Sequence, residues 1–328
     1  MKKAWFAAVA ALFAASPAFA ADKVTLMLNW YVYGEHAPFY YGKEKGYFAE
    51  QGIDLEIQEG RGSAVTAQAV AAKTADFGYI DVPTMIKAAA KGAPLVATGV
   101  LLQTSPMSAM GFSDKNIRKP EDIKGKTVAV TPGDSMSQIW PLFLKKTGLK
   151  ESDFRTVSGD AQTKLNAVIN GQADLLLGYV MDQSMKIKDA TGKAVTPIRF
   201  ADYGIKMVSS GIVANTDYVK EKEGLVRRFM AAATKSVEEA SKHPKDAAQS
   251  ILTANPKGGQ IATLTEGFEL TIPLYKDPDG KSKQPFRVSE DNMKESVDLL
   301  VEYGGLDAAA KGKLASFYTN AYLPNPGQ

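Results

Sequence analysis

Short apolar stretches alternate with amphipathic ones along this chain, and few architectures are compatible with that order. Strand patterns occur at 24–30 (VTLMLNW), 53–60 (IDLEIQEG), 76–81 (DFGYID) and 94–102 (PLVATGVLL). Helical patterns separate them, at about 37–51 and in SAVTAQAVAAKTA and PTMIKAAAKG. Strands that alternate with helices predict a parallel α/β sheet.

The same order begins again near residue 120. KTVAVTPGDS, SQIWPLFLKKTGL and FRTVSG are typical of a strand, a helix and a strand. The segments 69–81 (AVAAKTADFGYID) and 167–182 (AVINGQADLLLGYVMD) share a helix end, a turn, Ala-Asp and an apolar strand containing Gly-Tyr. This similarity indicates a duplicated plan. Beyond about 218 the pattern is mostly helical, with an apolar stripe along 225–240.

The N-terminus is typical of a secretory signal peptide. Lys2 and Lys3 precede the apolar run AWFAAVAALFAA, and Ala18-Phe19-Ala20 fits a cleavage site. We therefore expect residues 1–20 to be removed on export. The chain has no cysteine, so we expect no disulfide and no lipid anchor, and a soluble protein in a bacterial periplasm.

Composition argues against several kinds of chemistry. The 39 basic and 36 acidic residues nearly balance, which gives no reason to expect nucleic acid or an anionic membrane as partner. The two histidines, His36 and His243, lie far apart in the sequence, and no G-x-S-x-G, P-loop or G-x-G-x-x-G motif occurs. We expect no metal, no cofactor and no enzyme, with an exported carboxylate-based enzyme as the alternative of another class.

Several motifs together resemble a known family. They include K-x-x-G-Y-F-x-x-Q-G-I-D (43–54), ADFG (75–78) and DIKGKTVAV (122–130), with EHAP at 35–38. Over residues 24–230 the chain resembles periplasmic solute-binding proteins of ABC importers, in the branch that takes up thiamine-pyrimidine precursors and has nitrate and alkylsulfonate binders as neighbours. Eukaryotic thiamine-pyrimidine synthases share this fold but carry a cysteine-rich iron motif, so their activity is not carried over to a chain without cysteine.

The resemblance implies a type II periplasmic binding protein, with two α/β lobes joined by a two-segment hinge and ligand held in the cleft between them. Lobe 1 would contain 21–107 plus 208–328 with the C-terminal helices, and lobe 2 would be 108–207. QTSPMS (103–108) and FADYGIKMVSS (200–210) fit the two crossings. The implied partners are a small-molecule ligand and a membrane permease, and we expect the receptor itself to be a monomer.

Ligands of open α/β sheets bind outside the C-terminal ends of the strands, so the loops there supply the candidate binding residues. In the first lobe these are Asn29, Trp30, Tyr33, Glu35, His36, Arg61, Gly62, Ser63, Tyr79 and Asp81; the first crossing adds Gln103 and Thr104; the second lobe adds Gly133, Asp134, Ser135, Met136, Tyr179 and Asp182.

Two roles are expected for these residues. The rings of Trp30, Tyr33, Tyr79 and Tyr179 would stack on or border a flat ligand. Polar edges of the ligand would bind the acidic residues and His36. Several of these residues also have a structural interpretation. Trp30, Tyr79 and Tyr179 could belong to the core, and the aspartates could cap the helices that follow them.

These residues predict a receptor for a small heteroaromatic or aromatic molecule, such as a thiamine-precursor pyrimidine, rather than for a simple inorganic anion. Arg61 and the GRGSA turn favour the alternative, a sulfonate, a carboxylate or another organic anion. A solvated surface arginine explains Arg61 equally well.

Overall fold

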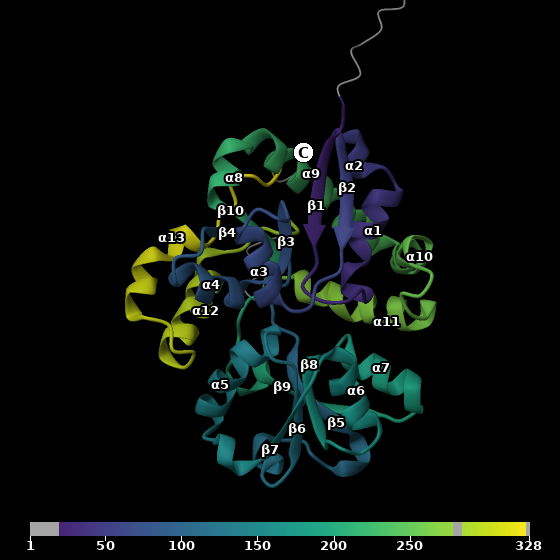
Figure 1. The fold of residues 1–328 in the computed structure, drawn as a ribbon, viewed down its shortest axis with the longest axis vertical. Helices are drawn as coiled ribbons and strands as arrows, with labels where there is room; N and C mark the ends of the chain where they lie inside the picture. The colour runs from purple at the N-terminus through teal and green to yellow at the C-terminus, as the bar shows by residue number, and fades with distance from the viewer. Residues whose placement is uncertain (1–19, 278–283, 326–328) are drawn as a thin grey trace, which may run out of the picture.

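The computed structural model describes residues 20–277 and 284–325 and shows two α/β lobes, one above the other (Figure 1). The predicted signal peptide, apart from its last residue, lies outside the described residues. In the part of the chain that the structure describes, no helix is both long and apolar enough to span a bilayer.

The upper lobe is built on a five-stranded sheet. Its strands, in spatial order, are β2 (Ile53–Gln58), β1 (Asp22–Met27), β3 (Phe77–Asp81), β10 (Ser210–Asn215) and β4 (Leu95–Val100). β1 is parallel to β2 and β3, whereas β10 is antiparallel to both of its neighbours.

The lower lobe repeats this plan. Its strands are β7 (Arg155–Ser158), β6 (Thr127–Val130), β8 (Leu175–Tyr179), β5 (Met107–Phe112) and β9 (Val195–Arg199). β6 is parallel to its neighbours and β5 is antiparallel to its own. The two similar sequence segments thus end in β3 and β8, which occupy equivalent places. The predicted α/β class is confirmed, but the sheets are mixed, because each contains one antiparallel strand that follows a crossing.

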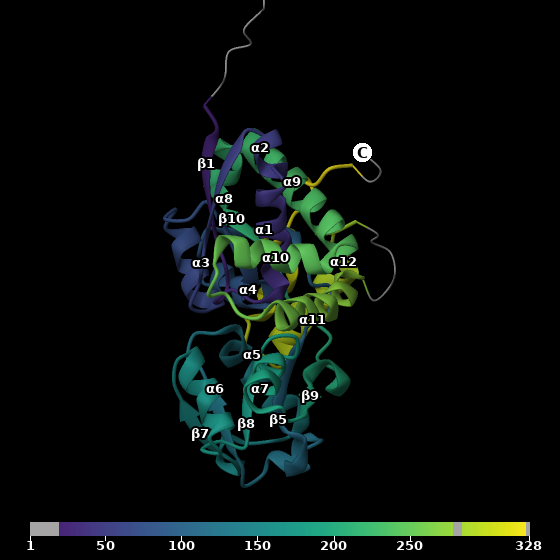
Figure 2. The same cartoon turned by 90° about the vertical axis from the view of Figure 1, so that its right-hand side faces the viewer.

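Helices pack around both sheets (Figures 1 and 2). The upper lobe has α1 (Ala37–Glu44), α2 (Tyr47–Glu50), α3 (Ser63–Ala71) and α4 (Val82–Ala90), followed after β10 by α8 (Thr216–Glu221), α9 (Glu223–Lys242), α10 (Pro244–Ala254), α11 (Ile261–Thr271), α12 (Glu290–Glu302) and α13 (Leu314–Phe317). The lower lobe has α5 (Ser135–Thr147), α6 (Ala161–Ile169) and α7 (Gln183–Thr191). The helix expected at about 37–51 is divided, because Gly46 adopts a left-handed conformation (φ 79°) between α1 and α2.

Aromatic side chains fill both cores. In the upper lobe Phe77 stacks on Phe229, with ring centroids 3.9 Å apart. In the lower lobe Phe143 stacks on Phe200, at 4.2 Å. The chain passes between the lobes at 101–106 and again at 200–209, where β4 gives way to β5 and β9 to β10. In Figure 1 the arrows of β1 and β2 point toward the lower lobe, so the loops after them meet it.

Candidate functional site

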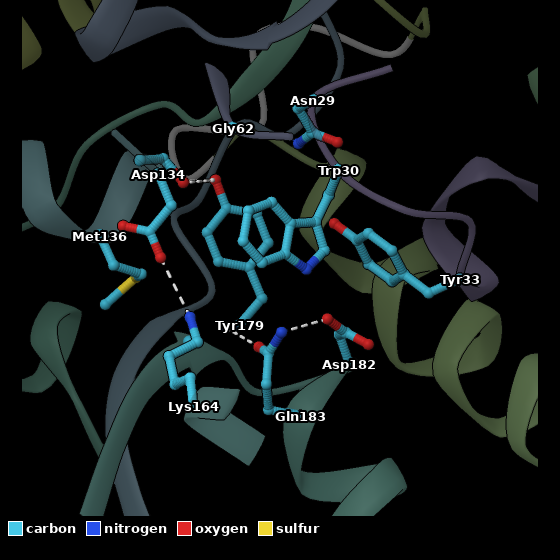
Figure 3. A pocket seen from close by; sticks show the side chains of 12 residues that line it. Asn29, Trp30, Tyr33, Gly62, Asp134, Met136, Lys164, Tyr179, Asp182 and Gln183 are labelled. Atoms are coloured by element: carbon cyan, nitrogen blue, oxygen red, sulfur yellow. Dashed lines mark hydrogen bonds and ion pairs between the residues drawn. The ribbon is translucent and has the colours of Figure 1, made fainter. Parts of the chain in front are cut away.

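A pocket lies between the lobes where these loops meet (Figure 3). The free space in it that a water-sized sphere can reach is small, about 30 Å³, so a ligand ring would need the lobes to open further before it could enter. Its lining residues are Asn29, Trp30, Tyr33, Gly62, Asp134, Ser135, Met136, Lys164, Gly178, Tyr179, Asp182 and Gln183.

Aromatic rings form much of the wall. Trp30 and Tyr33 come from the loop after β1, and Tyr179 ends β8 on the opposite lobe. All three side chains are buried although they border the pocket. A flat molecule can therefore contact rings from both lobes at once.

Two buried polar atoms at this wall have no hydrogen-bond partner among the described residues: Trp30 Nε1, a donor, and Asp182 Oδ1, an acceptor. Lys186 Nζ lies 3.9 Å from Asp182 Oδ1, beyond hydrogen-bonding distance. In Figure 3 the indole nitrogen is turned toward the side of the pocket that holds Asp182 and Gln183. Because an unpaired buried polar atom is costly, the pair points to a ligand that offers one acceptor and one donor.

The other oxygen of Asp182 is held by residues of both lobes. Tyr31, from the upper lobe, donates to Asp182 Oδ2 at 2.8 Å, and Gln183 Nε2 donates to the same oxygen. Lys186 Nζ lies 3.4 Å from the centroid of the Tyr31 ring. Tyr31 therefore contacts two charged side chains of the lower lobe, Asp182 and Lys186. Burial raises the pKa of Asp182. Although Asp182 precedes α7, its side chain makes no capping bond there.

Asp134 and Lys164 form a buried ion pair in the lower lobe. Lys164 Nζ donates to Asp134 Oδ2 at 3.0 Å, while Oδ1 of the same carboxylate caps α5 by accepting from Ser137 N–H. The Lys164 ammonium also lies 5.2 Å from the Trp30 ring centroid. The charge of Lys164 is therefore already compensated.

A chain of hydroxyls links the lobes beside the pocket. Ser135 donates to the Tyr179 hydroxyl (3.2 Å), Tyr179 contacts Ser209 Oγ (3.1 Å), and Ser209 donates to Asp81 Oδ2 (3.2 Å). Asp81 also caps α4 by accepting from Thr84 N–H at 2.9 Å. Burial raises the pKa of Asp81 to about 6.

Glu35 and His36 are wholly buried behind the wall, in the short helix η1 (Gly34–His36). Tyr33 and Tyr79 both donate hydrogen bonds to the Glu35 carboxyl group, Tyr79 at 2.6 Å. His36 Nε2 lies 2.9 Å from Asn29 Oδ1, and Tyr33 N–H donates to His36 Nδ1 at 3.4 Å. Burial lowers the pKa of His36 to about 3, so the ring is neutral and donates from Nε2 to Asn29.

The structure thus separates the predicted site residues into groups. Those that line the pocket are Asn29, Trp30, Tyr33, Gly62, Asp134, Ser135, Met136, Tyr179 and Asp182. Glu35, His36, Tyr79 and Asp81 lie behind it and support the wall, as does Ser63, whose Oγ accepts from Asp81 N–H.

The remaining predicted residues lie elsewhere. Arg61 is exposed and outside the lining. Gln103 donates to Val100 O and accepts from Asn292, both in the upper lobe. Thr104 is half-buried in the first crossing. Gly133 places its carbonyl oxygen 3.4 Å from Ala64 N, across the boundary between the lobes.

Sequence reasoning missed Lys164, Gly178 and Gln183 among the lining residues, and Tyr31 beside them. Lys164 is in α6, next to the apolar residues of that helix, where its spacing resembles an ordinary surface lysine. Gln183 follows Asp182 directly, so an extension of the strand-end rule by one residue would have included it.

Solved structures with this architecture include two named as ligand-binding proteins. The alkanesulfonate-binding protein from Xanthomonas axonopodis pv. citri, bound to MOPS, superimposes with a TM-score of 0.67 at 15% identity and covers 87% of this chain and 94% of its own. The periplasmic nitrate-binding protein from Synechocystis PCC 6803 gives a TM-score of 0.67 at 13% identity, covering 92% and 87%. Two α/β lobes with a pocket between them thus have the periplasmic-binding-protein fold.

Sequence relatives place the chain more narrowly. The formylaminopyrimidine-binding protein of Halalkalibacterium halodurans is 26% identical over 270 residues, 81% of each chain. The 4-amino-5-hydroxymethyl-2-methylpyrimidine phosphate synthase of Legionella pneumophila is 24% identical over 258 residues, 77% of this chain and 80% of its own. The NMT1/THI5-like family matches residues 34–247, and the chain belongs to that family.

Proposed function

We propose that the protein is the periplasmic receptor of an ABC importer and captures an amino-substituted heteroaromatic ring of the pyrimidine type. The main support is that two atoms on an aromatic wall, Trp30 Nε1 and Asp182 Oδ1, lack a hydrogen bond among the described residues, although Lys186 Nζ lies 3.9 Å from Oδ1 as an ion pair. A ring nitrogen would accept from Trp30 and an exocyclic amino group would donate to Asp182. Such a ring offers both edges together, and a simple inorganic anion does not.

The relatives support this ligand class. One is named a binding protein for formylaminopyrimidine, and another is named a synthase of an aminopyrimidine phosphate. Because one relative is named a synthase, an enzyme is the competing class of protein. A chain without cysteine and with buried, hydrogen-bonded carboxyl groups behind its pocket favours a receptor that binds without turnover.

Mass spectrometry of the purified protein under native conditions identifies any ligand retained from the cell, and a thermal-shift screen then compares aminopyrimidines, aromatic acids and sulfonates. We expect aminopyrimidines to raise the melting temperature most, without chemical conversion. Conversion of the bound compound would establish an enzyme instead. A preference for sulfonates would favour the organic-anion alternative, with Lys164 as the cation in the wall.

Trp30→Phe tests the main support directly. The variant keeps an aromatic ring and loses the Nε1–H donor, so we expect affinity for an aminopyrimidine to fall about fivefold, the equivalent of one hydrogen bond of about 1 kcal/mol. Trp140→Phe is the matched control, because Trp140 packs on Phe143 in the lower core, away from the lining. Isothermal titration calorimetry measures both. Equal affinities of the two variants would show that the Trp30 N–H does not donate to the ligand.

A further inference from the structure

A second cavity, which we call the outer chamber, opens beside the pocket at the same boundary between lobes. Tyr33 and Asp182 line both spaces, so the outer chamber adjoins the pocket across these two side chains. The free space in it that a water-sized sphere can reach is about 310 Å³, against about 30 Å³ in the pocket. A ligand ring in the pocket would therefore have room for a substituent on this side.

The walls of the outer chamber are largely apolar and come from both lobes. Leu165 and Met181 of the lower lobe and Leu264 of α11 are all buried, and Met185 is half-buried. Methionine side chains adapt their shape to what they contact. These walls suit the carbon atoms of a substituent.

The charges around the outer chamber do not suit an anion. Asp182 and Asp189 both line it, and Asp182 presents the Oδ1 described above, which lacks a hydrogen bond among the described residues. The cation there, Lys186, already lies over the Tyr31 ring and near Asp182. The N-terminus of α11 adds roughly half a positive charge, which is not enough to balance a phosphate next to two carboxylates. The Thr263 hydroxyl at this helix end donates to Asp189 and so is already engaged.

We propose that the pocket and the outer chamber form one two-part site, in which the ring occupies the pocket and an uncharged substituent ending in a hydrogen-bond donor extends into the chamber. The donor would bind Asp189, because Asp182 Oδ1 is assigned to the amino group of the ring, and both carboxylates would repel a phosphorylated substituent. This inference rests on the proposed function and narrows it to unphosphorylated ligands.

Calorimetry with three compounds that share one aminopyrimidine ring tests the inference: the ring with a methyl group, with a hydroxyalkyl group, and with the phosphate ester of that hydroxyalkyl group. We expect the hydroxyalkyl compound to bind at least about tenfold more tightly than its ester. Asp189→Asn should reduce this discrimination several-fold, because one of the two repelling charges is removed. Asp114→Asn, at an exposed position of the lower lobe away from both spaces, should leave it unchanged.

The outcomes separate the two claims. If the methyl and hydroxyalkyl compounds bind and the ester binds as tightly, the inference is overturned and the proposed function stands. If none of the three compounds binds, the proposed ligand class is wrong and the inference falls with it. If Asp189→Asn prefers the hydroxyalkyl compound over its phosphate ester as strongly as the wild type does, the substituent does not lie in the outer chamber.

Discussion

Glu35 and His36 hold two lining residues in place from behind the pocket wall. Glu35 accepts from the Tyr33 hydroxyl, and neutral His36 donates to Asn29. A charged His36 would lose the acceptor at Nδ1 that receives Tyr33 N–H. The Glu-His pair in the sequence therefore positions residues of the pocket wall and does not itself line the pocket.

Glu35 should make the stability of the fold depend on pH. Burial raises the pKa of Glu35 from 4.5 to about 7. Between these values the folded protein keeps a proton that the unfolded chain releases, so the free energy of unfolding falls as pH rises, by up to about 3 kcal/mol. Glu35→Gln removes this contribution. We therefore expect the stability of the variant relative to the wild type to increase from pH 4.5 to pH 7.

Urea unfolding followed by circular dichroism at several pH values measures this difference. Asp81, with its raised pKa, changes stability in the same direction, and His36, with its lowered pKa, in the opposite one. Both residues remain in the variant, so the comparison isolates Glu35. Glu56→Gln, at an exposed position of β2, is the control. A difference between Glu35→Gln and wild type that stays constant with pH would contradict a raised pKa.

At the scale of elements, the strand-end rule selected several residues that line the pocket, and also Glu35, His36, Tyr79 and Asp81, which lie behind it. The loops after β1, β6 and β8 supply Trp30, Asp134 and Asp182 because parallel strands end at one edge of each sheet. Tyr79 lies within β3, and its ring packs against Phe39 in the core rather than at the edge. The sequence shows where a strand ends, but not which of its last side chains faces the cleft.

The aromatic stretch 29–41 shows the same limit. Its first part forms the pocket wall and η1, and its second part begins α1, where Phe39, Tyr40 and Tyr41 are buried. Lys164 could not be predicted, since its role depends on a lobe-to-lobe contact with Trp30. Contacts between segments so distant in sequence leave no local pattern.

The loop after β2 should control how closely the lobes approach. Gly62 has φ 128°, and a Cβ there would lie 2.6 Å from Gly133 O of the opposite lobe. Gly62→Ala should therefore hinder closure and weaken binding of every ligand by about tenfold or more, because only the closed form binds fully. Gly92→Ala is the matched control: Gly92 has φ 97°, but a Cβ there meets no atom within 4 Å.

Both alanines strain the backbone and should lower stability by about 1 to 3 kcal/mol. Thermal unfolding measures that cost, and calorimetry measures affinity. Equal losses of affinity in the two variants would attribute the effect to strain in general rather than to the contact between Gly62 and Gly133.

At the scale of the whole molecule, contacts between the lobes occur on more than one side of the pocket. Lys188 of α7 pairs with Glu266 of α11 at 3.1 Å. Elsewhere Lys146 of α5 donates to the Tyr303 hydroxyl at 3.2 Å. The sequence predicted two α/β runs, whereas their two-lobed arrangement came from family resemblance, because periodicity carries no information on how two sheets face each other. These two contacts are exposed pairs of small individual energy, which a ligand can readily outweigh.

If ligand binding closes the lobes, it should bring α7 and α11 together more often. Because the chain has no cysteine, thiols can be introduced without background reaction. In Lys188→Cys/Glu266→Cys we expect ligand to speed cross-linking by a short bismaleimide several-fold, measured by mass spectrometry against time.

Lys235→Cys/Glu50→Cys is the matched control pair. Lys235 of α9 and Glu50 of α2 form an exposed ion pair at 2.8 Å within the upper lobe, so lobe movement does not change their separation. Its cross-linking rate should be the same with and without ligand. A ligand effect on both pairs would indicate a change in thiol reactivity rather than in geometry, and an effect on neither would mean that binding proceeds without closure. Only acceleration confined to the pair between lobes fits a receptor in which closure and capture are coupled.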